Sequence, residues 1–181
     1  GNKYIDDYLK DCDAVWKATK EYEKRKGTPY SLSTTYLQGD EGTVYKAVSF
    51  VDSRGQRLSI NALIAENEKT ISEGKSAKSS MSLMGLEKAN ASLALPELGF
   101  DAITYGKIIG QANKMVSQCE KSVDEVIAEK TAQNDALRVM QGKALVVGQK
   151  ASTDKVLLLH LDENETAPEG VLQQVRYFNM D

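Results

Sequence analysis

The sequence predicts an α+β fold in which long amphipathic helices pack on an antiparallel sheet. Apolar residues recur every three or four positions over about residues 4–26 and 101–141, which is the spacing of one face of a helix. A shorter helix is expected over about 81–95. The segments of about 30–62 and 143–178 instead show the apolar alternation and turn residues of strands.

The helix over about residues 4–26 carries an apolar stripe whose members alternate steps of three and four. Asp6 and Asp7 lie in its first turns and three basic residues close it, so both ends complement the helix dipole. Gly27 can take the left-handed conformation that ends a helix, and Pro29 prevents the helix from resuming.

The segment of about residues 30–62 is expected to form a three-stranded meander. Its first strand is rich in Tyr, Ser and Thr, its second alternates, and a turn with two glycines lies between them. The third strand would run from about Gln56 to Asn61. Residues 58–65 are ambiguous between strand and helix, because their apolar side chains also share a helical face.

Small and basic residues over 74–80 predict a solvated loop. The Gly-Lys-Ser sequence at its start matches the end of a phosphate-binding P-loop. That motif also needs a glycine where Lys69 stands, and a buried strand before the loop, so no nucleotide site is expected. The helix over about 81–95 follows, and Pro96 prevents it from continuing.

The longest helix is expected over about residues 101–141. Its apolar stripe fades after Lys130, where the helix is expected to bend or to project from the body. Gly106 and Gly110 lie four residues apart and form a flat ridge. Because glycine is costly inside a helix, we expect this ridge to accept the closely packed, alanine-rich helix before it.

The C-terminal part, about residues 143–178, is expected to form a hairpin and a last strand. Two apolar runs are separated by a turn sequence at 151–154, and residues 171–177 supply the last strand. His160, which is the only histidine, lies in the second apolar run. Packing therefore explains this side chain better than catalysis or metal binding does.

Composition favours an ordinary globular chain with one domain over residues 1–181. The 181 residues are 41% hydrophobic and 27% charged, which is outside the range of disordered chains. The net charge of -3 gives no reason to expect nucleic-acid binding. No apolar run approaches the roughly 20 residues that span a bilayer, so no transmembrane span is expected.

No residue pattern in the sequence predicts a catalytic, cofactor or metal site. The acidic loop at 162–165 lacks the alternating carboxylates and internal glycine of a calcium-binding loop. A Cys-His zinc site is excluded by the number of such residues. We therefore expect the chain not to be an enzyme.

Cys12 and Cys119 form the one candidate site, a structural disulfide. Each lies on the apolar stripe of a long helix, so the sulfurs could meet if these helices pack face to face. A bridge would close a loop of about 107 residues and stabilise the fold by about 4–5 kcal/mol in the loop-entropy model. The alternative is that both are small buried hydrophobic residues.

These observations favour a non-enzymatic, exported or envelope-associated protein that binds another protein or contributes to an assembly. The chain begins with Gly1 rather than methionine, which suggests a trimmed N-terminus. We expect a periplasmic or cell-envelope location, with a lipid anchor upstream of Gly1 as in a lipoprotein. The protein partner and the oligomeric state are left open.

Three other functions are compatible with the sequence. The main alternative is a small-molecule or lipid-binding carrier with a pocket between helices and sheet. An enzyme that uses carboxylates and tyrosines without a local motif would instead show a cleft with two facing carboxylates. An oligomer could be completed by a second chain at the 130–141 end of the long helix.

Overall fold

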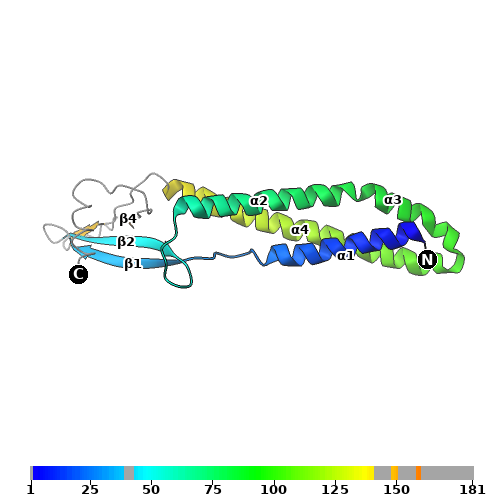
Figure 1. Ribbon diagram of the computed structural model, residues 1–181, viewed down its shortest axis with the longest axis horizontal. Coiled ribbons are helices and arrows are strands. Elements are labelled where there is room, and N and C mark those ends of the chain that lie inside the picture. The colour runs from blue at the N-terminus through cyan, green and yellow to red at the C-terminus, as the bar shows by residue number, and fades with distance from the viewer. Residues whose placement is uncertain (1, 39–42, 141–147, 151–157, 160–181) are drawn as a thin grey trace. The chain divides into compact units, whose positions relative to one another are not determined.

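The computed structural model describes residues 2–38, 43–140, 148–150 and 158–159 (Figure 1). Helices make up most of this part of the chain, and one antiparallel pair of strands makes up most of its sheet. The α+β prediction is therefore wrong. The described residues form a mainly helical fold with a small sheet.

The chain divides into two compact units, and each is described by itself. The first unit consists of residues 1–26 and 68–131, and the second consists of residues 27–67 and 132–181. The first unit is helical in its described residues, whereas the second holds the strands. A single domain over residues 1–181 stays a prediction.

Helix α1 (Lys3–Glu23) begins the first unit and corresponds to the helix expected over 4–26. The side chain of Asn2 caps it by accepting a hydrogen bond from the backbone N–H of Tyr4 at 2.9 Å. The helix ends slightly earlier than expected, and the backbone takes a positive φ of 90° at Gly27. Glycine tolerates that conformation because it has no Cβ.

Helix α2 (Ile60–Leu83) runs through residues 74–80, so the loop expected there is wrong. The serines that suggested a loop are accommodated inside the helix. Ser79, Ser80 and Ser82 each donate their hydroxyl proton to the carbonyl oxygen four residues earlier. The ambiguous segment 58–65 is helical from Ile60 onward.

A break at Met84 separates α2 from α3 (Gly85–Ala94), so the helix expected over 81–95 consists of parts of two elements. The 3-10 helix η2 (Leu95–Asp101) follows α3 and reverses the chain direction. Gly99 within η2 has a positive φ of 59°, a conformation that glycine adopts readily.

Helix α4 (Ala102–Met140) lies within one residue of the helix expected over 101–141 at each end. The close-packed ridge expected at Gly106 and Gly110 is only partly present. A Cβ added at Gly106 would meet the side chain of Leu95 at 4.0 Å, whereas one at Gly110 would meet no described atom within 4 Å. Gly110 therefore does not serve a close helix contact among the described residues.

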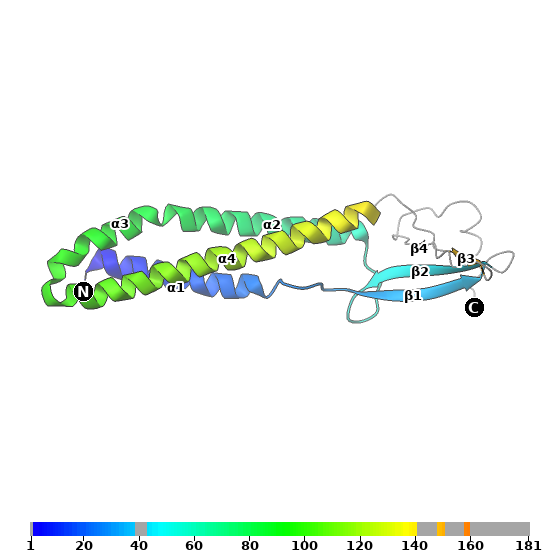
Figure 2. The same cartoon turned by 180° about the vertical axis from the view of Figure 1, so that it is seen from behind.

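Helices α1, α3 and α4 lie side by side in the first unit, as two opposite views show (Figures 1 and 2). The buried side chains of the first unit, including Met81 of α2, form two groups, and Met115 and Val116 contact both. The first group consists of Ile5, Tyr8, Cys12, Ala91, Ala94 and Ile109. The second group consists of Tyr22, Met81, Cys119, Val123 and Val126. Removal of this apolar surface from water holds the helices together.

The second unit contains an antiparallel hairpin of β1 (Ser31–Gln38) and β2 (Thr43–Val51), in which Ser31 lies opposite Val51. The prediction of a third strand in the meander over 30–62 is wrong. Val51 and Arg57 form a single bridge, and α2 begins three residues later. The helical face that its apolar residues share therefore outweighs their β propensity in this part of the chain.

The prediction of a C-terminal hairpin and a last strand over 143–178 is also wrong for the residues that the structure describes. Segments β3 (Gly148–Lys150) and β4 (Leu158–Leu159) both pair with β2, the first antiparallel and the second parallel. They use different residues of the long strand β2 instead of pairing with each other. The strand expected over 171–177 lies outside the described residues.

The core of the second unit forms where α2 begins and α4 ends. The ring of Tyr30 contacts the ring of Phe50 edge-on, with centroids 4.9 Å apart. The amide of Asn67 donates to Asn134 at 2.9 Å, and the amide of Asn134 donates to the Ile64 carbonyl oxygen at 3.1 Å. The buried apolar residues are Phe50, Ile60, Leu63, Ile64 and Leu137.

Helices α2 and α4 contain 24 and 39 residues, which is long enough to cross a bilayer by length alone. Both carry charged side chains along their length. Among the described residues, no helix is both long and apolar enough to span a membrane.

Candidate functional site

The first unit contains an open groove between α1 and α2, with one α4 residue at its base. Its volume is about 660 Å³, and its lining is mainly apolar. The apolar lining residues are Ala14, Val15, Ala18, Ala77, Met81 and Val123. We call this feature the inter-helix groove. It arises because alanines on both walls leave a space that larger side chains would fill.

Two ion pairs stand at the end of the inter-helix groove where α1 ends. Arg25, in the turn after α1, pairs with Glu73 on α2, and the Lys24 ammonium lies 2.8 Å from a carboxylate oxygen of Glu21. Each cation of the lining therefore has a matching carboxylate. This end of the groove is polar but carries no net charge.

The side chain of Tyr22 lies at the same end of the groove and is buried. Its hydroxyl donates to the carbonyl oxygen of Thr70 at 2.6 Å. Burial raises the pKa of Tyr22, because the phenolate would lose its hydration, and the nearby Arg25 acts in the opposite direction. Tyr22 thus stays a neutral hydrogen-bond donor that ties α1 to α2.

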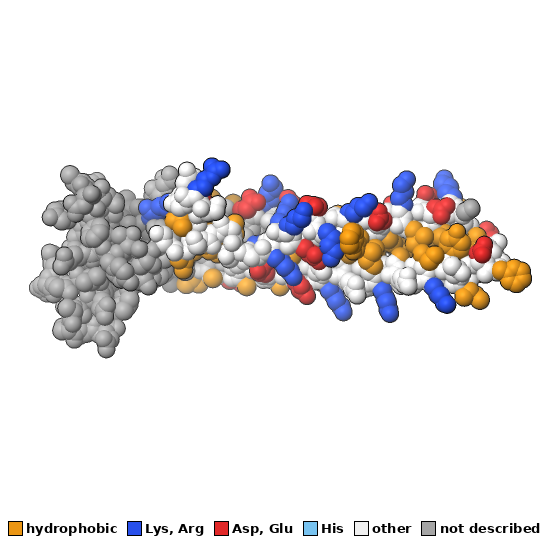
Figure 3. Space-filling view, turned by 90° about the horizontal axis from the view of Figure 1, so that it is seen from below, with side chains coloured by type: hydrophobic (Ala, Val, Ile, Leu, Met, Phe, Trp, Pro, Cys, Tyr) orange, Lys and Arg blue, Asp and Glu red, His pale blue; other side chains and the backbone are white. Residues whose placement is uncertain are grey.

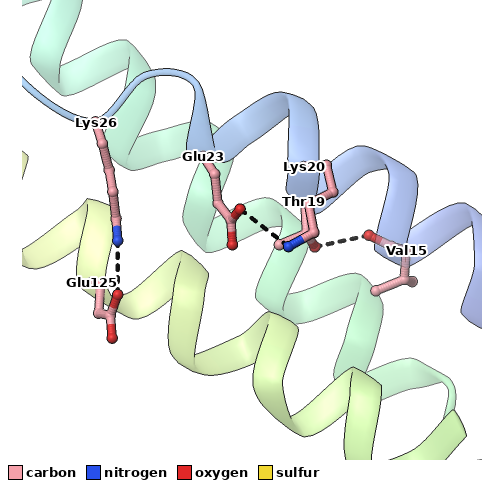
Figure 4. A network of polar contacts seen from close by, with 6 residues as sticks. All are labelled: Val15, Thr19, Lys20, Glu23, Lys26 and Glu125. Atoms are coloured by element: carbon pink, nitrogen blue, oxygen red, sulfur yellow. Dashed lines mark hydrogen bonds and ion pairs between the residues drawn. The ribbon is translucent and has the colours of Figure 1, made fainter.

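Polar contacts also join the end of α1 and the turn after it to α4 (Figure 4). The Lys26 ammonium, in this turn, lies 2.8 Å from a carboxylate oxygen of Glu125 on α4, and within α1 Lys20 reaches Glu23 at 3.4 Å. A hydrogen bond from Ser122 lowers the pKa of Glu23, and Lys20 adds to this effect. Pairs that are this exposed contribute little to stability, so this network positions α1 more than it stabilises it.

A second feature of the first unit is a set of large apolar side chains that face water around α3 and η2. Five of them are at least 72% exposed, and Tyr4 at the start of α1 is 59% exposed. The set, which we call the apolar tip, consists of Tyr4, Leu83, Leu86, Leu93, Phe100 and Ile103. Figure 3 shows hydrophobic side chains gathered towards this end of the first unit. Exposed clusters of this kind commonly mark interaction surfaces.

A shallow hollow of about 260 Å³ lies within the apolar tip, lined by Tyr4, Leu93 and Ala94 together with Asn90 and Glu97. Acidic residues outnumber basic ones in this stretch. Between positions 83 and 103 the chain carries Glu87, Glu97 and Asp101 against a single cation, Lys88. The sequence of α3 and η2 around the apolar tip is therefore mildly acidic.

Carboxylates of α1 and α3 lie close together near the tip. A hydrogen bond with Asp11 raises the pKa of Glu87, and loss of hydration and the negative charges of Asp11 and Asp7 add to the shift. The described residues contain no group of three or more His, Cys, Asp or Glu side chains that could hold a metal ion. The cluster therefore acts on the packing of α3 against α1.

The two cysteines of the predicted disulfide are free, buried thiols in the structure. Burial raises the pKa of the Cys12 thiol, a hydrogen bond with Tyr8 lowers it, and Asp11, Glu87 and Cys119 raise it further. Cys119 therefore lies near enough to Cys12 to affect its titration. The disulfide itself stays a prediction.

His160 and the acidic loop at 162–165 lie outside the described residues. Sequence reasoning did not find the inter-helix groove, because its walls come from helices that are distant in sequence. The apolar tip left a weak signal: Leu86 and Leu93 are seven residues apart, which places them on one helical face. The sequence did not show that this face meets water.

Comparison of the chain with protein-family models, with curated proteins and with solved structures gave no match.

Proposed function

We propose that this chain is a non-enzymatic, exported or envelope-associated protein that binds another protein through its apolar tip. The observation that carries the proposal is the exposure of five large apolar side chains around α3 and η2. Leaving such side chains in water is unfavourable, at about 25 cal/mol for each Å² of apolar surface. A partner that covers the tip would recover this free energy.

The charges in the sequence around the tip indicate the kind of partner surface. Between positions 83 and 103 the chain carries Glu87, Glu97 and Asp101 against Lys88. This acidic excess favours a protein surface with an apolar centre and basic residues near it. It disfavours an anionic bilayer surface, whose charge would repel the same carboxylates.

Site-specific photo-crosslinking tests this proposal. A photo-reactive phenylalanine analogue would replace Phe100 or Leu93 in the native cell, and the same analogue at Ala128, an exposed residue of α4, would serve as the control. We expect one protein adduct from both tip positions and none from Ala128. The adduct should be lost in the Leu86→Gln variant and should weaken as salt rises. Adducts with lipid alone, or the same adducts from Ala128, would overturn the proposal.

Export is the part of the proposal that rests on the cysteines. Cys12 on α1 and Cys119 on α4 are both buried thiols, and a disulfide between them is the bridge that we propose. Structural disulfides persist in oxidising compartments such as the periplasm and are rare in the cytosol. The oxidation state of this pair is therefore the most direct measurement of compartment.

A further inference from the structure

We propose that the inter-helix groove binds an uncharged lipid with one long acyl chain, of the monoacylglycerol class. The groove has a volume of about 660 Å³, within the range of about 300–1,000 Å³ that is usual for small-molecule sites. Its walls are formed by Ala14, Ala18 and Ala77, with Met81 and Val123 deeper in the first unit. Apolar walls of this kind favour an acyl chain, because its binding removes apolar surface from water.

The size of the groove favours a single chain over a partner helix. An α-helix with side chains is about 10–12 Å across, so a helix embedded to half its cross-section would have only about 14 Å of its length in a groove of about 660 Å³. The rest of the helix would stay outside the groove, whereas an acyl chain is narrow enough to lie inside it. A flexible acyl chain fills the same space along the whole length of the groove.

The hydroxyl groups in the lining already donate hydrogen bonds within the first unit. Thr19 donates to the Val15 carbonyl oxygen at 2.8 Å, and Ser80 donates to that of Ser76 at 3.2 Å. The hydroxyl of Tyr22 donates to a backbone carbonyl oxygen in the same way. The protons of these hydroxyls are therefore already used, and only their oxygen lone pairs are left to accept from a ligand, so apolar contact dominates recognition.

The charges at the end of the groove select an uncharged head group. Arg25 is paired with Glu73, and Lys24 is paired with Glu21. Because these charges balance, this end of the groove offers a carboxylate or phosphate head no net attraction to offset its loss of hydration. The hydroxyls of a glycerol head can instead accept from the cations and donate to the carboxylates without breaking either pair.

Displacement of a fluorescent probe tests the proposal. N-phenyl-1-naphthylamine is uncharged at neutral pH and fluoresces in apolar sites, so we expect it to bind at one saturable site. Monopalmitoylglycerol, used below its aggregation concentration, should displace it at a concentration at least tenfold lower than palmitate does. Absence of saturable binding, or displacement by palmitate at the same or a lower concentration, would overturn the proposal.

Variants that fill the groove locate the site. Ala18→Phe and Ser80→Phe place a ring in the groove from opposite walls, and each should weaken probe binding at least tenfold. Ala128→Phe, at an exposed position of α4 outside the groove lining, and Leu86→Gln in the apolar tip should bind as the unaltered protein does. Loss of binding in Leu86→Gln with retention in both groove variants would move the site to the tip and refute the proposal.

The Glu73→Gln variant tests the head-group selectivity separately. It removes the carboxylate that neutralises Arg25 and leaves the apolar lining intact. We expect the affinity for palmitate to rise at least fivefold while that for monopalmitoylglycerol changes little. An unchanged preference between the two lipids would show that the ion pairs do not select the head group.

Discussion

At the scale of single residues, Gly74 is the position where the structure tolerates no side chain. It lies inside α2, and a Cβ built there would collide with the hydroxyl of Tyr22 and would come within 2.8 Å of Cγ1 of Ile127. Real Cβ atoms essentially never approach so closely. Glycine at position 74 thus lets α2 lie against Tyr22 of α1 and Ile127 of α4.

Replacing Gly74 by alanine should therefore destabilise the first unit. We expect Gly74→Ala to lower the free energy of unfolding by about 1–3 kcal/mol, as overpacked core sites do. Gly110→Ala is the matched control, because a Cβ at position 110 meets no described atom within 4 Å. Alanine loses less backbone entropy on folding than glycine does, so that variant should be about 0.5–1 kcal/mol more stable. Urea unfolding of both variants measures the difference, and equal stabilities would contradict the packing argument.

The carboxyl cluster gives a prediction about pH. Because the pKa of Glu87 is raised in the folded chain, its contribution to stability is fully present below its unfolded-state pKa and is lost as pH rises through the folded-state pKa. Glu87→Gln stays neutral and keeps that contribution. We expect the variant to be more stable than the unaltered protein at pH 7, with the difference vanishing near pH 4.

Urea unfolding at pH 4, 5.5 and 7 measures this difference. Asp135→Asn removes an exposed carboxylate of α4, outside the cluster, and serves as the control. A stability difference for Glu87→Gln that is the same at all three pH values would show that the cluster with Asp11 and Asp7 does not oppose folding.

At the scale of elements, α2 illustrates how packing overrides a local signal. Its residues 74–80 are glycine, serine, lysine and alanine, a composition that favours a loop. In the structure they form helix, because Gly74 and Ala77 face the core of the first unit and the serines bond back to the preceding turn. By contrast, α1 was predictable because its apolar stripe, first-turn acids and stop residues all agree, and α4 because its apolar stripe is sustained as far as Lys130.

Helices α1 and α4 would be crosslinked by the predicted disulfide. We expect protein purified from an oxidising compartment to lack reactive thiols in urea and to have a mass about 2 Da lower than the reduced chain. Reduction should lower the free energy of unfolding by about 4–5 kcal/mol in the loop-entropy model. The double variant with alanine at Cys12 and Cys119 is the control, since reductant should not affect its stability. Two reactive thiols remaining after treatment with an oxidant would contradict the bridge and weaken the export proposal.

At the scale of the whole molecule, the described large apolar side chains of the first unit that are more than 70% exposed all belong to the apolar tip. Leu86, Leu93 and Phe100 are more exposed than the stripes of α1 and α4 that form the core. A folded chain gains no stability from such residues. We therefore expect their role to lie in binding rather than in folding, as proposed above.

Polar substitutions in the tip should separate these two roles. We expect Leu86→Gln with Leu93→Gln to change the free energy of unfolding by less than about 0.5 kcal/mol, as exposed sites do. Fluorescence of the dye ANS, which reports exposed apolar surface, should fall in the same variant. Leu32→Gln alters a single exposed leucine of β1 and should leave ANS binding unchanged. A large loss of stability in the tip variant would show that these leucines belong to the core.

The sequence by itself determined α1, α4 and the β1–β2 hairpin. In each of these, periodicity, capping and turn residues within a short stretch of chain specify one local conformation. Only the tertiary structure decided that α2 continues through residues 74–80, that β3 and β4 pair with β2, and where the inter-helix groove and the apolar tip lie. These features depend on contacts between residues far apart in sequence. The free energy of such contacts exceeds the weak local preferences, of less than about 1 kcal/mol per residue, that sequence patterns report.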